Sequence, residues 1–289
     1  MTRGALALLL GLCCALPAVA GDPGAVERGA YLAAAAGCGQ CHTDKRRGGK
    51  PYAGGRLLVT EYGSLRTPNI TPDSHTGIGK WRRADFVRAM RWGIAPDDSH
   101  YLPVFPFPFY NRLTNRDLAD LAAYLASLAP VEKPPSAAAT SLFPLARTRA
   151  AVAVAAESFP GPWRADPRRS AAWNRGAYLV ATVGRCGYCH TPRNRLGALD
   201  AARPLAGTWH SPDGKKAPNL TPDPATGLGR WSEDDIVTLL TNGQMPDFDF
   251  VGGPMGEIVQ GTARLTDADR QAIAVYLKSL PPLAMRKKD

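Results

Sequence analysis

The chain has 289 residues, enough for two domains that each bury a core. Its formal net charge of +10 gives a basic surface that can attract an acidic protein partner or an anionic membrane. With 26 prolines, 29 glycines and few alternating runs of β-branched residues, the composition argues against a strand-rich fold and favours short helices joined by irregular loops.

Residues 1–20 have the features of an export signal. Arg3 precedes an apolar run from Leu6 to Leu16, and the small residues Ala18-Val19-Ala20 form the expected cleavage site. No other stretch reaches the roughly 18 uninterrupted apolar residues that a membrane span needs. We therefore expect a periplasmic protein, soluble or peripherally membrane-associated, with no nucleic-acid partner; an uncleaved anchor is the alternative.

A helix-compatible segment from Val26 to Ala36 leads into a pentapeptide that occurs twice, as Cys38-Gly39-Gln40-Cys41-His42 and Cys186-Gly187-Tyr188-Cys189-His190. Two thiols three positions apart lie close together on one turn, so C-x-x-C-H suits covalent haem attachment. The porphyrin would be bonded by the thiols of Cys38, Cys41, Cys186 and Cys189, and the irons by His42 and His190. The sequence therefore predicts two covalently bound haem c groups.

Two other interpretations of the cysteine pairs fit less well. The pairs are 148 residues apart (186 − 38), whereas structural zinc pairs lie much closer. A thioredoxin-like redox pair needs a strand followed by a helix, and neither pentapeptide has that context.

The chain repeats itself beyond the pentapeptides. Asn69 and Trp81 return as Asn219 and Trp231 at one offset of 150 residues (219 − 69 and 231 − 81). A constant offset over this length indicates a duplicated domain. The repeated asparagines and tryptophans either donate hydrogen bonds to haem propionates or form turns and fill the core.

Each repeat closes with an apolar helix that follows a threonine. Thr114 with Asp117, and Thr266 with Asp269, have the spacing of a helix N-cap. We expect these helices over 114–128 and 266–280, each ended by proline.

The repeat divides the chain into a signal peptide (1–20), a first domain (21–130), a linker (131–172) and a second domain (173–289). The linker is rich in proline and alanine, and proline makes it semi-rigid. We expect its stretch from Leu145 to Ala156 to be a short helix lying across the domains; a disordered tether is the alternative.

The sixth iron ligand decides between electron transfer and chemistry at the iron. In the second domain we expect Met255, which lies in the turn-forming segment Gly252 to Gly256, opposite His190; Met245 is the alternative donor. A thioether ligand raises the reduction potential and favours one-electron exchange.

The first domain lacks the matching methionine, because the offset of 150 from Met255 leads to Phe105, which cannot bind iron. His100 is the nearest donor and the first candidate. Met90 is its rival, although it lies in an apparent helix where core packing is the ordinary role. An open or water-bound iron is the third possibility.

With these residues assembled, the chain resembles the cytochrome c subunits of bacterial membrane-associated alcohol, aldehyde and gluconate dehydrogenases. The resemblance covers nearly all of the mature chain and is carried by segments 68–73, 85–91, 176–194, 218–223 and 253–259. It implies an all-α fold with two tandem class I-like cytochrome c domains. It also implies relay of single electrons from a periplasmic dehydrogenase to a respiratory oxidase, quinone or another cytochrome, and it supports Met255 as ligand.

The chain departs from the resemblance in two respects. Many of those subunits have methionine where Phe105 stands, and they often carry a third haem domain and a membrane anchor. An alternative function is therefore a dihaem oxidoreductase or peroxidase, with substrate chemistry at the first haem and His100 as its acid–base group.

Overall fold

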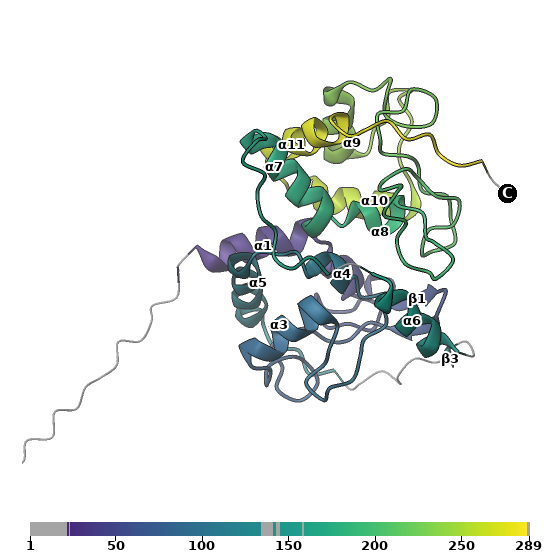
Figure 1. Cartoon of the computed structure of the whole chain (residues 1–289). Coiled ribbons are helices and arrows are strands. Elements are labelled where there is room, and N and C mark those ends of the chain that lie inside the picture. The colour runs from purple at the N-terminus through teal and green to yellow at the C-terminus, as the bar shows by residue number, and fades with distance from the viewer. Residues whose placement is uncertain (1–21, 23, 134–140, 143–144, 158, 288–289) are drawn as a thin grey trace, which may run out of the picture.

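The computed structural model describes residues 22, 24–133, 141–142, 145–157 and 159–287. The expected export signal lies outside these residues. Two helical units are stacked, the first purple to blue and the second green to yellow (Figure 1). The first contains α1 (Ala25–Ala35), α2 (Cys38–Cys41), the 3₁₀ turn η1 (Lys45–Arg47), α3 (Arg83–Trp92), α4 (Phe107–Tyr110) and α5 (Asn115–Ser127). The second contains α7 (Ala171–Tyr178), the π-helical turn η2 (Leu179–Val183), α8 (Cys186–His190), α9 (Glu233–Asn242), α10 (Gly253–Thr262) and α11 (Asp267–Lys278).

The opening and closing helices of each unit cross at a glycine. A β-carbon at Gly29 in α1 would lie 2.0 Å from the Asp120 carbonyl oxygen in α5, and one at Gly176 in α7 would lie 1.9 Å from that of Ala272 in α11. Only glycine permits this approach. The same crossing in both units supports the duplication inferred from the sequence.

The closing helices begin as expected. The Thr114 hydroxyl accepts a hydrogen bond from the Asp117 N–H at 3.0 Å, and the Thr266 hydroxyl accepts one from the Asp269 N–H at 3.2 Å. These N-caps satisfy an amide that would otherwise lack an intrahelical partner.

The expectation of an all-α fold is incomplete, because a small antiparallel sheet is present. Strand β1 (Leu57–Thr60) pairs with β2 (Gly63–Arg66), and β2 pairs with β3 (Ser141–Leu142). The strands are too short to give a clear alternating pattern in the sequence. The molecule remains mainly helical.

The alanine-rich part of the linker forms the expected helix, α6 (Ala146–Ala155). Its Ala150 packs with Tyr62 of the first unit. Just after α6, the Glu157 carboxylate accepts a hydrogen bond from the Leu199 N–H of the second unit at 2.9 Å. The segment thus contacts both units, as expected.

A tyrosine in the opening helix of each unit forms hydrogen bonds with the closing helix of the other unit. Tyr31 in α1 donates to the Asp269 carboxylate at 2.6 Å and accepts from the Thr266 N–H at 3.1 Å. Tyr178 in α7 makes the equivalent bonds to Asp117 and the Thr114 N–H. Each opening helix therefore stabilises the start of the other unit's closing helix.

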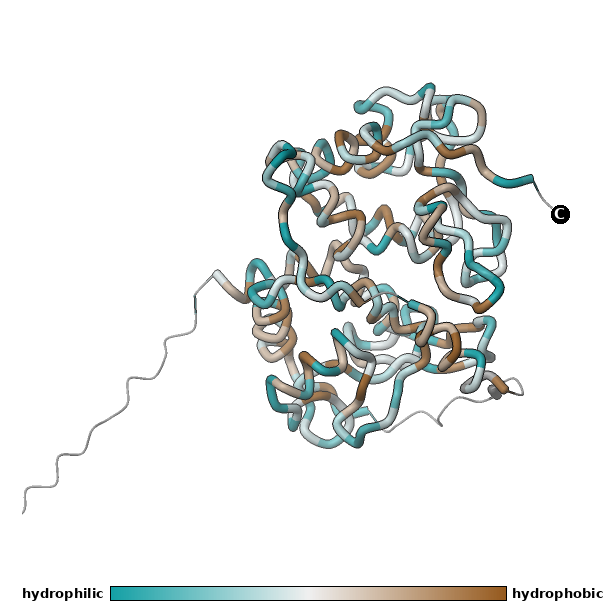
Figure 2. The backbone as a smooth tube through the Cα atoms, viewed as in Figure 1, coloured by the Kyte–Doolittle hydropathy of each residue, from teal (hydrophilic) through white to brown (hydrophobic). Residues whose placement is uncertain are grey.

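The core is continuous between the units. One cluster of buried side chains includes residues from both, among them Leu32, Leu121, Val180 and Ile273. Hydrophobic segments follow the helices, while hydrophilic segments occupy most of the outer loops (Figure 2). In the described part of the chain, no helix has the length and apolar character needed to cross a membrane.

Candidate functional site

Each cysteine pair lies on a short helical turn, and the residue just before that turn has a left-handed backbone conformation. Gly37, with φ of 67°, precedes α2, and Arg185, with φ of 44°, precedes α8. Cys38 and its three counterparts are free thiols and partly exposed. The thiols are therefore available for thioether bonds.

The two histidines are oriented alike. The Nδ1 atom of His42 lies 2.9 Å from the Pro68 carbonyl oxygen, and that of His190 lies 2.7 Å from the Pro218 carbonyl oxygen. A carbonyl accepts only, so Nδ1 carries the proton and Nε2 keeps its lone pair for a metal. Within the described residues, Nε2 of each ring has no hydrogen-bond partner.

The protonation states agree with this geometry. Burial lowers the pKa of His42 and His190 below the ordinary value, although the bond to the proline carbonyl opposes the effect. Both rings are therefore neutral at neutral pH, the form that ligates iron. Burial also raises the pKa of the Cys38 and Cys186 thiols to about 11, which speaks against a reactive redox dithiol.

Sequence reasoning missed the role of the two prolines. Pro68 and Pro218 lie in the repeated Pro-Asn segments, 26 and 28 residues after their histidines. Their repetition was the available signal. A proximal histidine needs an acceptor for its second nitrogen, and these carbonyls supply it.

The repeated asparagines form turns. The Asn69 amide donates to the Thr76 hydroxyl at 3.0 Å and the Val131 carbonyl at 2.7 Å, while its oxygen accepts from the Thr71 N–H at 2.9 Å. Asn219 makes the same set of bonds. The structure thus supports a turn-forming role rather than hydrogen bonding to haem propionates, because the nitrogen and the oxygen of each side-chain amide are both hydrogen-bonded within the protein.

The candidate ligand of the second iron, Met255, lies in the first turn of α10 rather than in an isolated turn, and it is half-buried. Pro254 at the start of that helix has no N–H to leave unsatisfied. Met245 is also half-buried and precedes this segment, where its N–H donates to the Asp249 carbonyl oxygen.

In the first unit, Phe105 lies between two tyrosines, with ring centroids 5.7 Å from Tyr101 and 5.7 Å from Tyr110. His100 is exposed, and its backbone pairs with that of Ile94. Met90 is buried in the core. The assignment of His100, or its rival Met90, as an iron ligand stays a prediction.

Each attachment turn touches the opposite unit. The half-buried Arg185, adjacent to Cys186, donates to the Ala36 carbonyl just before α2, and its charge acts on both cysteine pairs. Arg56 forms a two-point ion pair with Glu257 of α10, at 2.7 and 3.0 Å, and donates to the Gln40 carbonyl at 2.6 Å. Two arginines thus link the turn of one unit to the site of the other.

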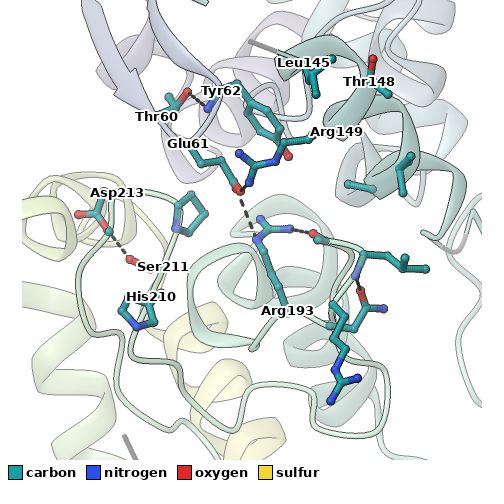
Figure 3. A pocket seen from close by; sticks show the side chains of 18 of the residues that line it. Thr60, Glu61, Tyr62, Leu145, Thr148, Arg149, Arg193, His210, Ser211 and Asp213 are labelled. Carbon is teal, nitrogen blue, oxygen red and sulfur yellow. Dashed lines mark hydrogen bonds and ion pairs between the residues drawn. The ribbon is translucent and has the colours of Figure 1, made fainter. Parts of the chain in front are cut away.

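A groove of about 750 Å³ lies between the units beside α6. Arg149 and Arg193 both point toward Glu61, at 3.7 and 3.9 Å (Figure 3). Two of its lining residues, Val59 and Leu145, are exposed apolar side chains. The groove is thus an apolar surface bordered by arginines.

The fold and the two sites define a protein with two covalent-haem domains, in which free cysteine pairs and neutral histidines fit the porphyrin and iron of haem c. The cytochrome c family model matches residues 26–129 and 174–281. The chain belongs to the cytochrome c family. It carries two covalently bound haem c groups and functions in electron transfer.

Individual relatives confirm the resemblance seen in the sequence. A diheme cytochrome c-type protein of Cereibacter sphaeroides is 39% identical over 91% of this chain and 88% of its own length. The alcohol dehydrogenase (quinone) cytochrome c subunit of Gluconacetobacter polyoxogenes is 40% identical over 91% of this chain and 57% of its own length. The gluconate 2-dehydrogenase cytochrome c subunit of Pantoea cypripedii is 37% identical over 97% of this chain and 65% of its own length. The chain therefore spans less than two thirds of these dehydrogenase subunits.

Proposed function

We propose that this protein is exported to the periplasm and relays single electrons from a partner dehydrogenase toward the respiratory chain. The acceptor is an oxidase, a quinone or another cytochrome. The observation that carries the proposal is that each attachment turn is bonded to the other unit, the second through Arg185 to the Ala36 carbonyl and the first through Arg56 to Glu257 of α10. Haems held by these two turns would both lie near this interface, where single electrons could pass from one unit to the other.

The organisation proposed is a removed signal (1–20), domains over 21–130 and 173–289, and a linker over 131–172. The family matches to residues 26–129 and 174–281 support it. The mature protein is soluble or attached to the membrane surface through its basic charge.

The iron ligands proposed are His42 for the first haem, and His190 and Met255 for the second. Bound haem supplies reversible one-electron exchange, and the protein holds each imidazole through a proline carbonyl. For the first haem, His100 is the first candidate and Met90 its rival.

The relay is tested first by asking whether a dehydrogenase gene lies beside the gene for this chain, and then by combining that dehydrogenase with the purified dihaem protein. Substrate of that dehydrogenase should reduce both haems, and an added terminal acceptor should reoxidise them. If neither haem is reduced while the dehydrogenase turns over with an artificial acceptor, the relay is wrong.

A second candidate function is substrate chemistry at the first haem, as in an oxidoreductase or peroxidase. Phe105 favours it, because this side chain cannot be an iron ligand and stands among aromatic rings. A high-spin signal that changes on addition of cyanide or peroxide would support this function. Two low-spin haems that ignore both reagents would reject it.

A further inference from the structure

The loop before Met255 exposes two aromatic side chains. Phe248 is 80% exposed and Phe250 is 57% exposed. They stand two residues apart in the segment 247–250, which we call the Phe loop. Paired exposed aromatics are typical of surfaces that bind another protein.

The first unit offers an internal comparison. Asp98 and His100 occupy the equivalent positions at the offset of 150, and both loops have the same backbone. Phe248 has φ of 64° and Asp98 has φ of 63°. The Phe248 N–H donates to the Met245 carbonyl at 2.9 Å, as the Asp98 N–H does to that of Ala95 at 3.0 Å. The loop therefore folds without phenylalanine.

Phenylalanine is an unfavourable choice at this position. A positive φ is uncommon for residues with a bulky side chain, whereas aspartate and asparagine adopt it more readily. An aromatic ring that is 80% exposed also gains little from folding. Neither the backbone nor packing among the described side chains explains Phe248.

The charges beside the rings indicate the chemistry of the partner. Asp247 and Asp249 are exposed. In the part of the chain that the structure describes, their carboxylates accept hydrogen bonds from the N–H groups of Asp249 and Phe250, at 3.2 and 2.8 Å, and meet no cation. Carboxylates around an apolar surface complement a partner with basic groups and are repelled by anionic lipid.

We propose that the Phe loop docks a redox protein whose contact face is apolar and rimmed by lysine or arginine. The loop ends five residues before Met255, so docking places this partner beside the second haem. This proposal deepens the proposed function and rests on it. It makes the second unit the one that exchanges electrons with that partner.

The test is electron transfer from the pre-reduced dihaem protein to a blue-copper protein with an apolar, lysine-rimmed face over its metal. F248N/F250S, which removes both rings, adds no metal ligand and puts asparagine at the left-handed position, should lower the second-order rate at least tenfold. D247N/D249N should lower it at low salt, with the difference fading at high salt. D97N is the matched control in the first unit, because the Asp97 carboxylate accepts from the Ser99 N–H as that of Asp247 does from the Asp249 N–H, and it should leave the rate unchanged.

Two further readouts separate docking from damage to the protein. The rate of oxidation by ferricyanide, a small acceptor that needs no docking surface, should be equal in F248N/F250S and wild type. The variant's Tm should rise by about 2–4 °C, because asparagine tolerates the backbone better.

The proposal is overturned if F248N/F250S reduces the blue-copper protein as fast as wild type, or if wild type reduces ferricyanide but not that protein. Ring-dependent binding to phosphatidylglycerol vesicles would assign the loop to a membrane instead. Ring-dependent dimerisation would assign it to a second copy, through the arginine-bordered groove. Failure of wild type with both acceptors would count against the relay itself.

Discussion

At the scale of residues, the two attachment turns differ in the residue that precedes them, which is Gly37 in the first unit and Arg185 in the second. Arg185 holds the left-handed position that glycine holds in the first unit, at a conformational cost that Gly37 avoids. Its side chain compensates by bonding to the Ala36 carbonyl of the first unit. A cation near both cysteine pairs also favours the reduced, less positive form of each haem.

Replacing Arg185 by methionine should therefore lower both reduction potentials by tens of millivolts. R185K keeps the charge and should retain most of the potential while losing the fork geometry of the guanidinium. Potentiometric titration of the two variants checks this. Equal potentials in R185M and wild type would contradict the electrostatic role.

The attachment residues could be predicted from sequence because their chemistry is local. Cys38 to His42 lie within one turn, so spacing alone identifies them. Two other contacts could not be predicted, because they depend on the tertiary fold. The Pro68 carbonyl lies 26 residues after His42, and Glu257 lies 201 residues after Arg56. Exposure of His100 likewise depends on how its loop folds, which spacing does not determine.

At the scale of elements, each unit depends on the glycine where its helices cross. G29A should destabilise the protein by about 1–3 kcal/mol, because its methyl group would meet the Asp120 carbonyl at 2.0 Å and outweigh alanine's higher helix propensity.

Thermal unfolding of G29A checks this, with G252A as the matched control. A methyl group added at Gly252 would have no other atom within 4 Å, and this residue has an ordinary φ of −114°. G252A should lower Tm less than G29A does, because its methyl group meets no clash and only a weaker N-cap results. A G29A protein as stable as G252A would show that the helices shift apart without cost.

The helices were predictable for local reasons, and the sheet was not. Threonine caps and apolar periodicity specify α5 and α11 directly. The hairpin of β1 and β2 has only four residues in each strand, and its third strand comes from the linker. Such short pairings depend on contacts that a periodic pattern does not show.

At the scale of the whole molecule, the hydrogen bonds of Tyr31 and Tyr178 to aspartates of the opposite unit hold the two units together. Asp269 receives both Arg175 of its own unit and Tyr31 of the other. Burial alone would raise the pKa of Asp269, but these hydrogen bonds outweigh it and the pKa is lowered. Its ionised form is therefore stabilised by folding.

This shift predicts loss of stability in acid. A carboxyl whose folded pKa is lowered contributes above its unfolded pKa, about 4, and that contribution is lost as pH falls through the folded pKa. D269N should be less stable at neutral pH and should lose less stability than wild type on acidification. Denaturant unfolding at several pH values measures both; identical pH profiles would contradict the pairing.

The most direct test of electron relay is a spectroelectrochemical titration of the purified mature protein. We expect two haem c groups that are each reduced and reoxidised in a one-electron step, with only one showing thioether ligation. A haem that stays oxidised across the range, or that responds only in the presence of peroxide, would contradict the relay.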